Sequence, residues 1–320
     1  MKFVSFTEGE NECKRTGVFS KDELFIIDVN SLNLSRNFKD LNELIQNVSS
    51  EDIIKLKTII NESIFYNYDV FKRERCTVHV PIEKPIHDIL CVGVNYKDHL
   101  EETQTHFDDS FEEPQKTVYF TKRVTKAIGP EDEIDGHFEI NNQLDYEVEL
   151  GVVIGKTGVN IRKEEVEDYI FGYTVINDIS ARKLQKEHVQ WFRGKGLDTF
   201  TSLGPCILHK SAVPFPIKLK VCSRVNGEER QSSNTGLFIS DVSDIVSELS
   251  KGMTLEAGDI IATGTPSGVG MGFSPPRYMS SGDVVECEIE SIGILKITLS
   301  KCFNIINIKA KSDVLMNILK

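Results

Sequence analysis

From residue 147 onward the chain is dominated by short runs of apolar and β-branched residues, and this pattern limits the possible folds more than any other feature. Such runs, separated by polar turns, predict β-strands. Helical patterns do not alternate regularly with them, which disfavours a Rossmann fold and a (β/α)₈ barrel. We therefore predict a mostly β fold of the α+β class. The predicted strands cover residues 147–154, 169–176, 217–225, 259–263, 284–289 and 294–299.

The N-terminal part of the chain has a different pattern. Two strand-like runs precede two stretches with apolar residues at helical spacing, one around Leu44 and one around Ile59. A polar segment containing Pro81 then leads into the strongly apolar run 89–94. We predict a small α+β N-terminal domain over residues 1–84, a larger domain over 85–309 and a C-terminal tail over 310–320.

Charge excludes several classes of partner. The formal net charge of −12 would repel nucleic-acid phosphates and anionic membranes. No apolar run approaches the roughly 18–20 residues needed to cross a bilayer, and the first residues lack a signal-peptide core.

The seven cysteines are scattered and form no C-x-x-C pair, which indicates reduced thiols. We expect a cytoplasmic protein that binds neither nucleic acid nor membranes, and that gathers positive charge locally if it handles acidic metabolites.

Two acids, Glu147 and Glu149, stand two residues apart at the start of a predicted strand. Alternate side chains of a strand share one face, so both carboxylates would point to the same side. Oxygen-only ligands favour Mg²⁺, Mn²⁺ or Ca²⁺ over zinc. The alternative is a solvated strand face. The apolar run 150–154 that follows favours the metal site, because it takes this strand into a core.

A third acid, Asp178, follows the next predicted strand and precedes a short helical pattern. If a helix begins there, Asp178, Arg182 and Gln185 share one face. A carboxylate for a metal, a guanidinium for a substrate carboxylate and an amide donor would then converge. The alternative is that Asp178 only caps the helix and Arg182 is exposed.

A histidine and a glutamate follow the apolar run 89–94. His99 and Glu102 are three residues apart, within hydrogen-bonding reach on one helical turn, so Glu102 can orient the imidazole and raise its basicity. The pair could then shuttle a proton or activate water, although a lone histidine is more often structural. The acid-rich stretch that continues to Lys116 is typical of a mobile lid over a site.

Two glycine-containing segments also stand out. Lys195 lies between Gly194 and Gly196, and Thr265 lies in a glycine-rich turn after the predicted strand 259–263. Backbone N–H groups and the hydroxyl of Thr265 could contact an anion there. Neither segment has the spacing of a phosphate-binding loop or of a dinucleotide fingerprint.

In this order, these segments resemble the fumarylacetoacetate hydrolase family over about residues 89–299. The N-terminal extension and the run 250–259 are most similar to a subgroup from bacilli that includes an oxaloacetate decarboxylase. The segments that carry the resemblance are Gly93-x-Asn95-Tyr96-x-x-His99-x-x-Glu102, Asp145-Tyr146-Glu147-x-Glu149-Leu150, Gly172-Tyr173-Thr174, Asn177-Asp178-x-x-x-Arg182, Gly194-Lys195, Val225-Asn226-Gly227-Glu228 and Gly258-Asp259-x-Ile261-x-Thr263-Gly264-Thr265-Pro266.

The resemblance implies a β-roll catalytic domain, usually in a homodimer, with Mg²⁺ or Mn²⁺ bound by Glu147, Glu149 and Asp178. It implies that His99 and Glu102 form a catalytic dyad on a lid, and that Lys195 also acts in catalysis. The residues that match substrate-contacting positions are Arg182, Gln185, Lys195 and Thr265.

The resemblance also implies a substrate class: a short 2-oxo acid or dicarboxylate. Such an acid can chelate a cation that stabilises the enolate formed as the neighbouring C–C bond breaks. We expect acylpyruvate-type hydrolysis, oxaloacetate decarboxylation or both. The alternatives are oxaloacetate keto–enol tautomerisation, hydration or isomerisation of a 2-oxo acid, and, outside enzymes, a binding protein that senses a dicarboxylate.

Overall fold

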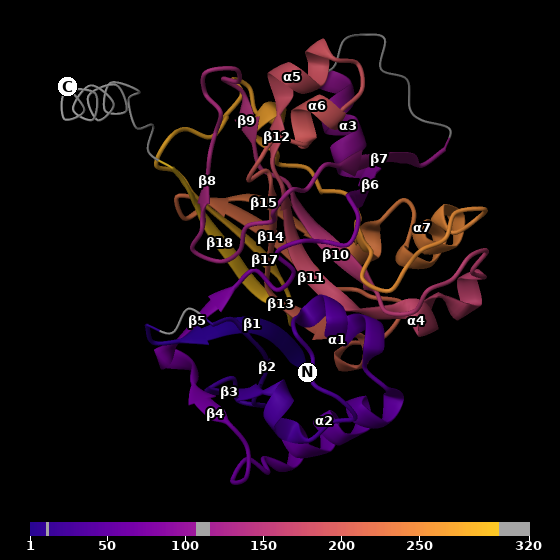
Figure 1. Ribbon diagram of the computed structural model, residues 1–320. Helices are drawn as coiled ribbons and strands as arrows, with labels where there is room; N and C mark the ends of the chain where they lie inside the picture. Colours follow the sequence, from indigo (N-terminus) through magenta and orange to yellow (C-terminus); the bar gives the residue numbers. More distant parts are fainter. Residues whose placement is uncertain (11–12, 107–115, 301–320) are drawn as a thin grey trace, which may run out of the picture.

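The computed structural model of the protein describes residues 1–10, 13–106 and 116–300. An eleven-stranded sheet runs through the molecule, with its strands in the order β4-β3-β2-β1-β13-β11-β10-β16-β6-β7 and with β5 paired to β1 (Figure 1). Neighbouring strands are antiparallel, except that β16 and β6 are parallel. The strands are β1 (Lys2–Glu8), β2 (Arg15–Phe19), β3 (Phe25–Asp28), β4 (Val70–Lys72), β5 (Cys76–His79), β6 (Ile89–Gly93), β7 (Val118–Lys122), β10 (Val148–Ile154), β11 (Ile170–Asp178), β13 (Thr201–His209) and β16 (Ile260–Ala262).

A second sheet packs against the centre of the first. It has five strands in the order β15-β14-β17-β18-β8, and β14, β17 and β18 contact β10, β11 and β13. A separate two-stranded sheet pairs β12, which follows β11 in the chain, with β9, which precedes β10. The strands are β8 (Glu133–Ile134), β9 (Leu144–Asp145), β12 (Ser180–Ala181), β14 (Lys220–Val225), β15 (Glu228–Asn234), β17 (Val284–Ile289) and β18 (Gly293–Leu299).

The large sheet is buried on both faces. Val152 contributes to the core between the two sheets, whereas its neighbour Val153 contributes to the core on the other face, as the alternation of strand side chains requires. The helices are α1 (Leu41–Asn47), α2 (Ser50–Glu62), α3 (Lys97–His106), α4 (Val166–Tyr169), α5 (Arg182–Glu187), α6 (Phe192–Lys195) and α7 (Val242–Leu249), and the short 3₁₀ helices are η1 (Val29–Leu32), η2 (Arg73–Arg75), η3 (Lys163–Glu165), η4 (Lys210–Ala212), η5 (Thr235–Leu237) and η6 (Gly270–Gly272).

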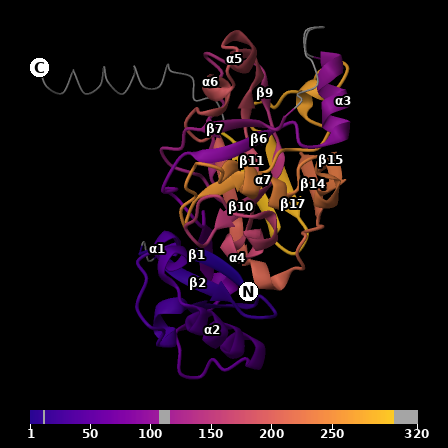
Figure 2. The same cartoon turned by 90° about the vertical axis from the view of Figure 1, so that its right-hand side faces the viewer.

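The N-terminal strands extend the large sheet. Strand β1 pairs with β13, with Phe3 opposite Ile207, so the N-terminal segment shares a sheet and a core with the rest of the protein. In both views this segment, in indigo to purple, lies at one end of the molecule, and α3, α5 and α6 lie toward the other end (Figures 1 and 2).

The predicted elements are largely confirmed. All six predicted strands are present, with ends that differ by a few residues, and helices α1 and α2 cover the two helical patterns. The chain is sheet-rich α+β, as predicted. Helix α7 begins after Asp241, which forms a capping box with Asp244. Asn226 and Gly227 form the two-residue turn of the β14–β15 hairpin, both with positive φ.

The helix predicted from Asp178 begins later than expected. Asp178 is the last residue of β11, opposite Thr201, and residues 180–181 form strand β12. Helix α5 therefore starts at Arg182, and Asp178 is neither on its face nor its N-cap. The backbone of this segment is extended because it pairs with β9, a partner that helical periodicity does not reveal.

Two predictions concern residues outside the described part. The predicted lid beyond α3 falls mostly on residues 107–115, and the predicted tail and the end of the larger domain fall on residues 301–320. Within the residues that the structure describes, no helix is long and apolar enough to cross a membrane.

Candidate metal centre and active site

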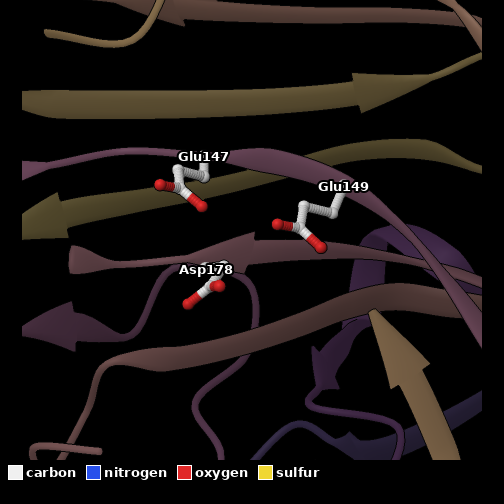
Figure 3. Close-up of side chains that lie close together, drawn as sticks. All are labelled: Glu147, Glu149 and Asp178. Atoms are coloured by element: carbon white, nitrogen blue, oxygen red, sulfur yellow. The ribbon is translucent and has the colours of Figure 1, made fainter. Parts of the chain in front are cut away.

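Three carboxylates meet where β10 begins and β11 ends. Glu149 lies in β10 and Glu147 immediately precedes this strand. Val148 lies between them, opposite Asn177, the residue before Asp178. One oxygen of each carboxylate lies within 4.8 Å of one oxygen of each other carboxylate (Figure 3). The three side chains are buried, with exposures of 5%, 2% and 0%. The same-face interpretation of the Glu-x-Glu pair therefore holds, and the solvated strand face is excluded.

The protein environment treats the three acids differently. Burial raises the pKa of Glu149 well above its ordinary range, and the nearby carboxylates of Asp178 and Glu147 raise it further. Burial also acts on Glu147, but Lys195 and Arg182 outweigh it and lower the pKa of Glu147 to about 2. An uncompensated buried acid beside two others is a site where a cation would lower the electrostatic energy. The all-oxygen donor set fits a hard divalent cation, so this triad can hold a metal.

Lys195 lies over the triad. Its Nζ is 2.7 Å from an oxygen of Glu147 and 2.8 Å from an oxygen of Asp178. Burial favours the neutral amine, yet the two carboxylates raise the pKa of Lys195 above its ordinary value, so it stays charged. Gly194 brings the lysine close, because a Cβ at this position would lie 2.7 Å from the backbone nitrogen of Gln185.

Arg182 and Gln185 come to the same pocket from α5. The guanidinium of Arg182 lies 2.7 Å from Glu147 through Nη2, and its Nη1 donates to Gln185 Oε1 at 3.1 Å. Their convergence was expected from a shared helical face with Asp178. It arises instead because β12 returns the chain to the triad and α5 then starts at Arg182.

The dyad residues hydrogen-bond as expected. On α3, the Nδ1 of His99 lies 2.9 Å from Glu102 Oε2. The other oxygen of Glu102 accepts a 2.9 Å hydrogen bond from the amide of Gly268. His99 is only 6% exposed and faces the pocket of the triad, so it is an internal group of the site rather than a surface group.

Thr265 completes the set of predicted pocket residues. Its hydroxyl donates to the carbonyl of Val148 at 2.9 Å, and the neighbouring amide of Gly264 donates to Glu149 at 2.8 Å. One pocket is lined by seven of the nine predicted site residues, while Glu102 and Asp178 adjoin it through hydrogen bonds to His99 and Lys195. The seven are His99, Glu147, Glu149, Arg182, Gln185, Lys195 and Thr265.

Sequence reasoning missed two buried residues at the site, Lys122 and Gln231. Lys122, fully buried at the end of β7, forms an ion pair with Asp178 and donates to the carbonyls of Ile179 and Phe200 at 3.0 and 2.9 Å. A lysine at the end of an apolar strand was the available signal. Gln231, also fully buried, donates to Thr265 at 2.7 Å and accepts from Val148 N at 3.1 Å. Nothing in the polar run around Gln231 distinguishes it, because β15 joins the site only through sheet packing.

The fold and the site define a sheet-rich protein with a buried carboxylate triad beside two cations and a His–Glu pair. Residues 88–300 match the family described as fumarylacetoacetate (FAA) hydrolase C-terminal. The chain belongs to this family, which confirms the resemblance seen in the sequence.

Relatives and solved structures agree with this assignment. The chain is 50% identical over 218 residues to the oxaloacetate tautomerase YisK of Bacillus subtilis. The matched region covers 68% of this chain and 71% of that protein. It is similar in structure to a fumarylacetoacetate hydrolase from Exiguobacterium antarcticum, with a TM-score of 0.76, 37% identity and coverage of 94% and 99% of the two chains. A 5-carboxymethyl-2-hydroxymuconate delta-isomerase from Mycobacterium smegmatis gives a TM-score of 0.69, 26% identity and coverage of 94% and 100%.

These names span hydrolases, isomerases and a tautomerase, so members of the family are enzymes with differing reactions. The similarity to these solved structures also confirms the predicted fumarylacetoacetate-hydrolase-type fold.

Proposed function

We propose that this protein is a divalent-metal-dependent enzyme that moves a proton next to the carbonyl of a short 2-oxo diacid, as in the keto–enol tautomerisation of oxaloacetate. The observation that carries this proposal is the position of His99, which faces a pocket containing three buried carboxylates and the cations Arg182 and Lys195. The tautomerase activity named for the B. subtilis relative supports the choice among the reactions of the family.

The metal in this proposal is Mg²⁺ or Mn²⁺, held by Glu147, Glu149 and Asp178. The oxygen-only donor set supports a hard cation. When bound, such a cation would act as a Lewis acid toward a substrate carbonyl and stabilise developing enolate charge.

The positive side chains bind the substrate in this proposal. A 2-oxo diacid carries two negative charges into a protein whose net charge is −12, so local cations must offset them. Arg182 offers a fork of N–H donors that pairs with a carboxylate, and Lys195 offers a point charge beside the triad. Gln185, from α5, and Thr265, from the segment after β16, add polar contacts to the pocket.

His99 is the proton carrier in this proposal. Its Nδ1 is engaged with Glu102, which fixes the ring and leaves Nε2 for the substrate. The Nε2 would take the proton from the carbon next to the carbonyl, and a proton would be delivered to the carbonyl oxygen to give the enol, with the reverse transfers giving the keto form, so that no water is consumed. Asparagine in place of His99 keeps polarity and removes the base, and we expect turnover to fall by about 10²–10⁴-fold.

C–C bond cleavage is the second candidate function, supported by the structural similarity to a hydrolase. The same pocket would stabilise the same enolate, while His99 would instead take a proton from water for hydrolysis, or manage protons in a decarboxylation. The family resemblance in the sequence predicts cleavage. We rank tautomerisation above it because of the identity to the tautomerase relative.

One set of assays distinguishes these functions. Purified protein with Mg²⁺ or Mn²⁺ is supplied with oxaloacetate and acetylpyruvate, and enol decay, CO₂ release and acylpyruvate cleavage are followed separately. We expect enol–keto exchange to be the fastest reaction and to fall to the uncatalysed rate on chelation. Unchanged activity after thorough chelation, or turnover only of substrates that lack a 2-oxo acid, would contradict the proposal. Tight binding of oxalate without turnover of any substrate would favour the sensing protein.

A further inference from the structure

Asp145 is a buried carboxylate that the proposed reaction does not use. It ends β9, is 0% exposed and lies behind the pocket. Four N–H groups donate to its two oxygens, from Tyr146 N at 3.0 Å, Arg182 Nε at 2.8 Å, Gly270 N at 2.6 Å and Met271 N at 3.0 Å. A fully buried carboxylate with this many donors is held in one position.

One set of contacts fixes Arg182. Asp145 accepts a hydrogen bond from the Nε of the guanidinium. The Nη1 donates to Gln185, and the Nη2 lies against Glu147. The guanidinium is planar, so a partner at Nε sets the plane in which the two terminal nitrogens lie. Asp145 therefore determines how the fork of Arg182 is presented to the pocket.

The other set of contacts fixes the loop that includes η6. The backbone amides of Gly270 and Met271 donate hydrogen bonds to Asp145. In the same loop, the amide of Gly268 donates a hydrogen bond to Glu102. The same loop leaves room for Glu102, because a Cβ on Gly272 would lie 1.9 Å from its Oε1. One carboxylate thus connects the substrate-facing arginine with the loop that holds the partner of His99.

We propose that Asp145 is a positioning residue that sets the orientation of Arg182 and the place of the 268–272 loop, and through them the affinity for the anionic substrate. This inference rests on the proposed function for the identity of the substrate. The contacts of Asp145 are independent of that function. Residues that orient the groups contacting a ligand typically change affinity or activity by about 10- to 100-fold when replaced.

The test compares Asp145→Asn and Asp145→Ala with Asp52→Asn. Asparagine preserves the volume, removes the charge and places an NH₂ group where two donors already point. Asp52 is a matched control, since it is also a buried carboxylate, 5% exposed, and accepts from Ser35 and Ser49 far along the chain from the site. If Asp145→Ala does not fold, the isosteric Asp145→Asn carries the test.

Three measurements are made on each full-length variant. Hydrogen exchange reports the amides of Gly270 and Met271, calorimetry with Mg²⁺ reports the affinity for oxalate, and steady-state kinetics report KM and kcat for oxaloacetate. For Asp145→Asn we expect faster exchange at residues 268–272, oxalate affinity lowered by about 10- to 100-fold and KM raised by a similar factor, with a smaller change in kcat. Asp52→Asn should change none of these.

Faster exchange with unchanged oxalate affinity and KM would overturn the inference, because Asp145 would then be only structural. Unchanged exchange and unchanged affinity would overturn it as well. If the wild-type protein binds oxalate but does not turn over oxaloacetate, the proposed function fails, and the oxalate affinity of the variants still decides the role of Asp145.

Discussion

At the scale of single residues, Glu149 shows why the triad could hold a cation. Throughout the described ranges, no lysine or arginine forms an ion pair with Glu149, whereas Glu147 and Asp178 both contact Lys195. The raised pKa of Glu149 means that it holds its proton above the ordinary range. A divalent cation must displace that proton, so the apparent metal affinity should increase with pH.

We predict that Glu149→Gln separates two effects. In the metal-free protein, folding raises the pKa of Glu149 above its ordinary value of 4.5. Above pH 4.5 the unfolded chain therefore loses this proton while the folded protein keeps it, so the free energy of unfolding falls as pH rises. The glutamine variant lacks this penalty and should be more stable than wild type at pH 7.5 without metal. Wild type should gain about 2.7 kcal/mol at a metal concentration 100 times its Kd, and the variant should gain almost nothing.

Thermal melts with and without Mg²⁺ or Mn²⁺ measure both effects, with the exposed Glu290→Gln as control. Metal stabilisation that persists in Glu149→Gln would show that the triad is not the metal site.

Gly272 gives a second prediction at this scale. A methyl group there would collide with the carboxylate end of Glu102, which is a flexible group that can move away. Gly272→Ala should therefore change stability little but displace Glu102 from His99, and so reduce turnover about as much as Glu102→Gln does. Kinetics and melting temperatures of the two variants test this. A loss of stability with normal turnover in the folded protein would contradict it.

At the scale of elements, strands β1, β11 and β13 meet around His209. The ring lies 6.3 Å from Phe3 and 5.4 Å from Phe171, between centroids, and is 5% exposed. Burial, with further contributions from Lys57 and nearby cations, lowers the pKa of His209 to about 3. The folded protein keeps this ring neutral, whereas the unfolded chain protonates it near the ordinary value of 6.5.

This shift predicts how stability depends on pH. Because the pKa is lowered on folding, the contribution of His209 is fully present above pH 6.5 and is lost progressively as pH falls toward 3. Between pH 7 and pH 5, wild type should lose about 2 kcal/mol more than His209→Asn, which does not titrate. Urea unfolding at the two pH values measures the difference, and equal losses would show that the ring is protonated in the folded state.

At the scale of the whole molecule, the N-terminal segment and the larger part share a sheet. Phe3 is 0% exposed, lies opposite Ile207 of β13 and packs on Phe171 at 5.3 Å between ring centroids. The shared core predicts that both parts unfold together. Phe3→Ala should lower the free energy of unfolding by about 3–5 kcal/mol.

The single tryptophan makes this prediction measurable. Trp191 lines the pocket, far from Phe3 in the chain, and its fluorescence reports the unfolding of the larger part. We expect Phe3→Ala to shift the fluorescence transition as much as the circular dichroism transition. A fluorescence midpoint equal to that of wild type would show that residues 1–84 unfold independently, as the predicted boundary would allow.

The expected homodimer also stays a prediction, which sedimentation can test.

The sequence alone determined what depends on short-range periodicity. Alternation at the start of β10 placed Glu147, just before the strand, and Glu149 on one face. Three-residue spacing joined His99 to Glu102, and ordered motifs indicated the family. Only the tertiary structure decided which distant segments meet. Pairing of β12 with β9 kept residues 180–181 extended after Asp178, and it brought Arg182 to the triad by a route that helical spacing had not predicted. Lys122, Asp145 and Gln231 reach the site through sheet packing and loop contacts, since local patterns record how a side chain points and not which strand or loop lies beside it.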